Sequence, residues 1–226
     1  MWGGVLGFMI IAALGARLGY VFRRKRALQK AEAETLFAGA LQIVENPVFE
    51  PQGPHQFPKL KGTYQGFPIQ VHPVVDTLAT RRLPALWLLV TLQDTLPLTA
   101  RFDMMMRPAG PTTFSNFDHL PDTLKHPGGF PEHAVIRTDN ADGVLPAEII
   151  KPHLGLFAGP RAKELLITGN GIRIVWLLAE SDRVRYGIFR QADFGTVAIE
   201  PQTLIDIADC LLAIRRAIHD WDEAKK

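Results

Sequence analysis

The chain has 226 residues, of which 47% are apolar and 21% are charged, so it can form one well-packed domain and is not a disordered chain. A single cysteine, Cys210, excludes a disulfide within the chain and a Cys-based zinc site. The first 26 residues hold five of the 25 basic residues and no acid, which leaves 20 bases against 23 acids, a net charge of −3, in the rest. Because the basic excess is confined to this terminus, we expect no nucleic-acid partner. The sequence shows no cofactor signature, so we also expect no cofactor.

Residues 2–22 form an apolar run interrupted by one charge, Arg17. A spanning helix needs about 20 residues, and the basic cluster follows the run instead of preceding it as in a signal peptide. The pattern predicts an uncleaved anchor over 1–22, with the lipid bilayer as partner and the following domain on the cytoplasmic side. The expected membrane-interface residues are Trp2, Arg17, Tyr20, Arg23, Arg24, Lys25 and Arg26.

Glycines in this run occur four apart, as Gly3/Gly7 and Gly15/Gly19. Such spacing allows two membrane helices to approach closely, which would give a homodimer. The alternative, which we favour, is that glycine is simply frequent in membrane spans.

Residues 23–46 are rich in helix-forming residues and predict a basic juxtamembrane helix, or stalk, that ends at Asn46-Pro47. Residues 47–58 contain four prolines and predict a linker. The globular domain is then expected over 59–226.

Strand patterns begin at residue 59, with a hairpin that turns at Gln65-Gly66. Residues 86–92 are a continuous apolar run typical of a buried strand, and 98–106 is its expected neighbour. Within that neighbour, the three methionines 104–106 alternate faces, which favours packing over metal binding.

The second half of the domain starts with a surface excursion over 108–131, rich in proline and glycine. A strand over 134–138, a short helix over 144–156 and a hairpin with a type I′ turn at Asn170-Gly171 are expected next. A strand over 183–189 and a long amphipathic helix over 202–224 complete the chain. This order predicts an α+β fold with a mostly antiparallel sheet behind an N-terminal transmembrane helix.

One group of side chains has the chemistry of a metal site. Imidazoles and carboxylates within the excursion suit zinc or iron, and the candidate ligands are His119, Asp122, His126 and His133, with Asp118 beside them. The histidines are seven apart and fit no HExxH spacing, so solvated loop histidines are the competing interpretation.

Nucleophile motifs are scarce. The only serines, Ser115 and Ser181, lie outside any GxSxG elbow. Cys210 lies beside the apolar stripe of the last helix and is expected to be an inert thiol. His72 on a strand is expected to be structural, and the acids around Asp182 are expected to form a polar turn.

Aromatic side chains in the hairpin and the excursion allow two interpretations. They form either an exposed partner surface or a satellite core under long loops. The residues concerned are Tyr64, Phe67, Phe114, Phe117 and Phe130.

Several spaced elements between residues 59 and 218 resemble a family of bacterial membrane proteins with an N-terminal anchor and a domain of unknown function. They include Gly62-Thr63-Tyr64-Gln65-Gly66, Phe117-Asp118, Ile136-Arg137-Thr138-Asp139, Leu145-Pro146 with Ile149-Ile150, 165–174 and the last helix. Residues 120–131 depart from that pattern. The resemblance implies an inner-membrane setting and carries no activity.

Three function classes remain open from the sequence. The leading hypothesis is a membrane-tethered, non-enzymatic interaction or accessory domain that binds a protein partner. The others are a metal-dependent hydrolase built on the 118–133 loop, and a sensor of a small ligand or a lipid headgroup.

Overall fold

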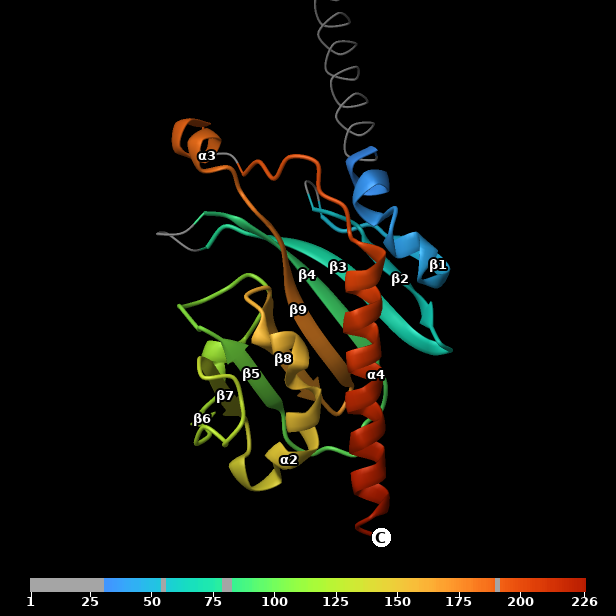
Figure 1. The fold of residues 1–226 in the computed structure, drawn as a ribbon, viewed down its shortest axis with the longest axis vertical. Coiled ribbons are helices and arrows are strands. Elements are labelled where there is room, and N and C mark those ends of the chain that lie inside the picture. The colour runs from blue at the N-terminus through green and yellow to red at the C-terminus, as the bar shows by residue number, and fades with distance from the viewer. Residues whose placement is uncertain (1–30, 54–55, 79–82, 190–191) are drawn as a thin grey trace, which may run out of the picture.

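The computed structural model describes residues 31–53, 56–78, 83–189 and 192–226 (Figure 1). Its centre is a sheet of nine strands in the order β1-β2-β3-β4-β9-β8-β5-β7-β6, and every paired strand is antiparallel to its neighbour. The antiparallel sheet and the C-terminal helix agree with the sequence prediction. The strands are β1 (Glu45–Glu50), β2 (Lys59–Tyr64), β3 (Phe67–Asp76), β4 (Ala85–Gln93), β5 (Phe102–Met106), β6 (Asp122–Thr123), β7 (Ala134–Thr138), β8 (Ala162–Thr168) and β9 (Gly171–Glu180).

The helices are fewer and cluster toward the C-terminus. Residues 31–37 are helical at the start of the described chain. The α-helices that follow are α2 (Ala147–Ile150), α3 (Arg183–Phe189) and α4 (Pro201–Glu223), and the 3-10 helices are η1 (Ala40–Gln42), η2 (Phe117–His119), η3 (Ala141–Gly143) and η4 (Lys151–Ala158).

The transmembrane part of the fold prediction, and the single-pass inner-membrane localisation that depends on it, need correction. In the stretches that the structure describes, no helix combines the length and the apolar character needed to cross a bilayer, so these predictions are wrong. The predicted span, 1–22, and the predicted interface residues lie outside those stretches. The latter are Trp2, Arg17, Tyr20, Arg23, Arg24, Lys25 and Arg26.

The predicted stalk and linker contribute directly to the domain. Leu36, Phe37 and Val44 are buried in its main core, and 45–50 form the first edge strand of the sheet. Leu36 accepts a backbone hydrogen bond from Ile199, and a Cβ on Gly39 would collide with the carbonyl oxygen of Ile199. The domain therefore includes the residues assigned to the stalk from 36 onward.

Two hairpins form where the sequence predicts them, with different turns. Gln65 and Gly66 both have positive φ, 49° and 82°, as a type I′ turn requires. In the second hairpin β8 ends at Thr168 and β9 begins at Gly171, which alone has positive φ, 141°. The type I′ prediction there is wrong. Gly171 is needed for a different reason, because a Cβ would strike the backbone of Leu92.

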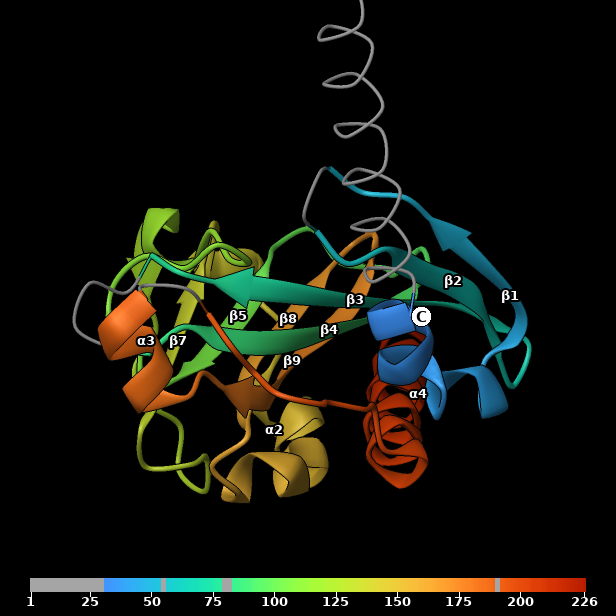
Figure 2. The same cartoon turned by 90° about the horizontal axis from the view of Figure 1, so that it is seen from above.

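One face of the sheet is covered by helices. Helix α4 lies along β4 and β9, while α2 and η4 pack beside it over β8 (Figures 1 and 2). Alternate strand residues such as Leu88, Met104 and Ile174 are fully buried beneath these helices, together with Leu211 from α4. This face follows ordinary strand and helix periodicity, since both contribute one apolar side.

The opposite face is covered by chain without long helices. The segment that follows β5 crosses it and includes η2, on the side away from α2 and α4 (Figure 2). Phe114 and Phe117 from this segment pack on Leu89, Met105 and Val175 in a second, smaller apolar cluster. This result favours the satellite-core interpretation for these two aromatics, and Phe130 is buried in the main core.

Two local predictions differ from the structure. The strand β5 pairs with β7 and β8, so it is not the neighbour of β4. Residues 183–189 form a helix because Asp182 accepts a hydrogen bond from the backbone N–H of Arg185 at the helix start.

Candidate functional site

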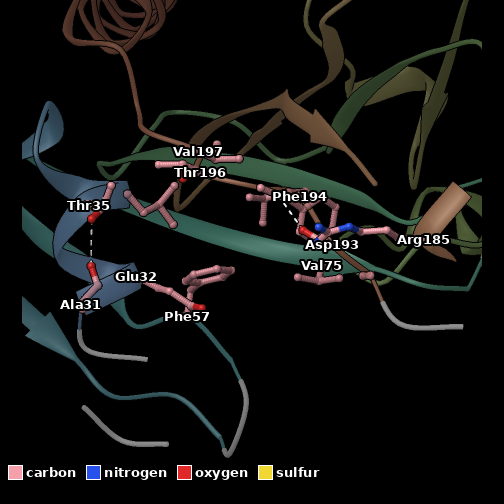
Figure 3. A pocket seen from close by; sticks show the side chains of 14 residues that line it. Ala31, Glu32, Thr35, Phe57, Val75, Arg185, Asp193, Phe194, Thr196 and Val197 are labelled. Atoms are coloured by element: carbon pink, nitrogen blue, oxygen red, sulfur yellow. Dashed lines mark hydrogen bonds and ion pairs between the residues drawn. The ribbon is translucent and has the colours of Figure 1, made fainter. Parts of the chain in front are cut away.

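A half-open cleft of about 1120 Å³ lies at one end of the sheet (Figure 3). Residues 31–36 form one wall, residues 192–197 form the other, and β3 and β4 contribute the floor. The volume is slightly above the range typical of ligand sites in proteins, roughly 300–1,000 Å³. The cleft is thus the first candidate for a binding site.

The lining of the cleft is apolar inside and polar at its rim. Leu36 and Leu86 are buried, and Phe57, Val75 and Val197 are half-buried around the same space (Figure 3). Such a lining favours a ligand that brings apolar groups into contact with the floor.

Charged side chains stand at the mouth of the cleft. Arg185 from α3 donates to Asp193 across the rim, and Glu32 is exposed on the helical wall. The Asp193 pKa lies below its ordinary value because the backbone N–H of Gly195 and the guanidinium of Arg185 donate to it. With two acids and one base, these rim residues carry a net negative charge.

The wall at 192–197 belongs to no helix or strand, and Gly195 within it has a positive φ of 63°. It is tied down at its start, where Asp193 accepts from the backbone N–H of Asp182 and donates its own N–H to Ser181 Oγ. These two bonds join residue 193 to residues 181 and 182, at the start of α3. The wall is therefore held at its start, beside α3.

A second polar site lies inside the domain, on the loop-covered face. Asp103 of β5 and Glu164 of β8 are 2% and 0% exposed. Glu164 accepts hydrogen bonds from Ser115 Oγ and from Arg173, whose Nη2 lies 3.4 Å from Glu164 Oε2. Asp103 shares a hydrogen bond with Glu164, while its Oδ1 has no partner.

Burial controls the ionisation of this acid pair. Desolvation, aided by the charge of Glu164, raises the pKa of Asp103 to about 8. Burial also raises the pKa of Glu164, although Arg173 and Ser115 favour its charged form. One proton held by Asp103 leaves Glu164 and Arg173 as a neutral pair, which is the arrangement that buried charges require.

The predicted metal ligands are not assembled into a site. His119 in η2, His126 and His133 are exposed, and Asp122 is half-buried in β6. His126 Nε2 lies 3.0 Å from the carbonyl oxygen of Pro131, a local loop contact. Within the described residues no three His, Cys, Asp or Glu side chains are arranged to hold a metal ion.

The remaining sequence candidates have structural environments. Cys210 is half-buried, and its thiol donates to the carbonyl oxygen of His153. Burial raises the pKa of Cys210 to about 11, which agrees with an inert thiol. Burial likewise lowers the pKa of His72, on the same sheet face as Arg173.

Comparison with protein-family models, with curated proteins and with solved structures finds no match. The resemblance to anchored bacterial proteins therefore stays a prediction.

Sequence reasoning missed both the cleft and the acid pair. The cleft joins residues 31–36 to 192–197, which are distant in sequence. Asp103 and Glu164 each interrupt an otherwise apolar strand, FDMMM and AKELLIT, and this interruption was the available signal. Their proximity depends on the pairing of β5 with β8, which no local pattern indicates.

Proposed function

We propose that this chain is an interaction domain whose cleft binds an extended, apolar segment of a partner protein. The observation that carries the proposal is the half-open apolar cleft between residues 31–36 and 192–197. An apolar trough of this size can accept several side chains of an extended peptide.

The charge at the rim narrows the class of partner. Glu32 and Asp193 outnumber Arg185, so basic residues flanking the apolar segment complement the mouth of the cleft. Such charges mainly improve the association rate and the selection of partner, while the apolar contacts supply affinity.

A labelled peptide tests the proposal. The probe is a fluorescein-labelled hexapeptide with a lysine at each end and alternating valine and leucine between them, and binding is followed by anisotropy. Val197→Asp places a carboxylate on the apolar wall and should weaken binding at least about tenfold, since a charge in an apolar contact costs more than 1.4 kcal/mol. Val48→Asp is the control, because Val48 is 63% exposed on β1, away from the cleft.

Equal peptide affinity of the Val197→Asp and Val48→Asp variants would show that the peptide does not bind in the cleft. So would equal binding of a hexapeptide in which serines replace the apolar residues. A single-chain alkyl amphiphile should displace the peptide from the wild-type chain. Displacement, together with loss of peptide binding in the Val197→Asp variant, would show that the apolar floor of the cleft is the binding surface.

A further inference from the structure

We propose that Asp103 and Glu164 form a proton-binding site whose occupancy fastens the cover segment, residues 108–121, to the sheet. Neither acid lines the cleft. The site binds a proton, and its occupancy determines whether the cover segment stays attached to the sheet.

The cover segment is attached through the acid pair itself. Ser115, in the middle of the segment, donates to Glu164 Oε1 and accepts from the backbone N–H of Phe117. The same hydroxyl thus links the segment's own turn to a buried carboxylate of β8. On either side of Ser115, Phe114 and Phe117 insert into the smaller apolar cluster, so opening of the segment would expose both rings.

Other contacts hold the segment at its two ends. Near its start Thr113 reaches the carbonyl oxygen of Val75, and Phe114 packs against Trp87 with ring centroids 5.4 Å apart. Near its end Arg137 Nη1 donates to the carbonyl oxygen of Asp118, and its guanidinium lies over the ring of Phe117. None of these contacts involves a carboxyl or an imidazole side chain, so among the contacts described for the segment the acid pair is the one that contains carboxyl groups.

The charged groups around the pair come from every strand beside it. Arg101 immediately precedes β5, Arg173 lies on β9, and Arg137 lies on β7 directly opposite Asp103. Arg137 is directed to the cover segment, and only Arg173 is bonded to Glu164. His72 on β3 faces Arg173 from the far side and has a lowered pKa, so it adds no charge to the group near neutral pH.

The direction of the pH effect follows from burial. In the closed state the raised pKa of Asp103, about 8, keeps its proton, whereas an open segment admits water and restores an ordinary carboxyl pKa. The closed state therefore binds the extra proton, and opening becomes easier as pH rises from about 4 to 8. Above pH 8 both states are deprotonated and the dependence ends.

Hydrogen exchange of the full chain measures this opening. We expect the protection of amides in 112–120, corrected for intrinsic exchange, to fall between pH 5 and 8 by up to about tenfold per pH unit and then to level off. Asp103→Asn keeps a neutral donor toward Glu164 and should remove the slope. Asp209→Asn is the control, since Asp209 is exposed and bonds Tyr64 on the other face of the domain.

Two results would overturn the proposal: a slope that persists unchanged in Asp103→Asn, or a wild-type segment whose protection does not vary with pH. Infrared spectroscopy of the wild-type chain adds a test that needs no variant. A protonated carboxyl stretch is expected at pH 7 and should disappear above pH 9. Its absence at pH 7 would show that the acid pair holds no proton at that pH.

Discussion

The two faces of the sheet are buried by different means. The helix-covered face meets α4, α2 and η4 through alternate apolar side chains. The loop-covered face buries an acid pair under the cover segment, with unbonded polar atoms nearby, among them Asp103 Oδ1, Arg173 Nε and Arg137 Nε. One sheet thus combines a face that serves only for packing with a face whose cover segment closes according to the protonation of the acid pair.

Core truncation should separate the two faces most strongly. Phe102→Ala, under the helices, should cost about 4 kcal/mol of unfolding free energy, because the rigid surroundings cannot close around the cavity. Phe114→Ala should cost about half as much, since the cover segment can move and admit water. Urea titration of both variants gives the values, and equal costs would mean that the faces are equally firm.

Removal of Glu164 should have the next largest effect. Glu164→Leu leaves Arg173 without its carboxylate in a largely buried position and should cost about 3 kcal/mol. The double variant Glu164→Leu with Arg173→Met should recover most of that loss, because apolar replacements remove both desolvated charges together. A double variant as unstable as the single one would show that the network contributes more than its charge pairing.

The polar contact on the helix-covered side should matter least. Asp94, after β4, accepts from Arg215 and His219 of α4. Burial opposes ionisation, but these bonds hold the pKa of Asp94 below its ordinary value. Asp94→Asn should cost about 1 kcal/mol at pH 7, in thermal or urea unfolding.

The pH dependence of that contact has the opposite sign to that of the acid pair. A lowered pKa means that the folded state releases its proton more readily, so the contribution of Asp94 is complete at neutral pH and is lost on acidification through its folded pKa. Wild-type and Asp94→Asn should therefore converge in stability at low pH. Convergence at high pH would contradict this assignment.

Local pattern was sufficient for some parts of this fold. The hairpin at Gln65-Gly66 and the helix α4 were predicted because each depends on adjacent residues: a turn of positive φ in one, a 3.6-residue apolar period in the other. Neither prediction depended on contacts between residues that are distant in the sequence.

Other parts depended on contacts that no window of sequence contains. Residues 36–50 carry a helical composition followed by prolines, yet Phe37 is fully buried and 45–50 pair with β2. Residues 183–189 alternate enough to suggest a strand, and the capping bond from Asp182 decides for a helix. The acid pair required the pairing of two strands separated by some sixty residues, which sequence periodicity does not encode.

The two ends of the open sheet have a consequence for polymerisation. At one end β1 carries a bulge between Glu45 and Val48, and Pro47 lacks the N–H that a new strand would use. At the other end β6 has only two residues, Asp122 and Thr123. Neither end presents an unbroken row of donors and acceptors, so another copy cannot extend the sheet into a fibril without first rebuilding an edge.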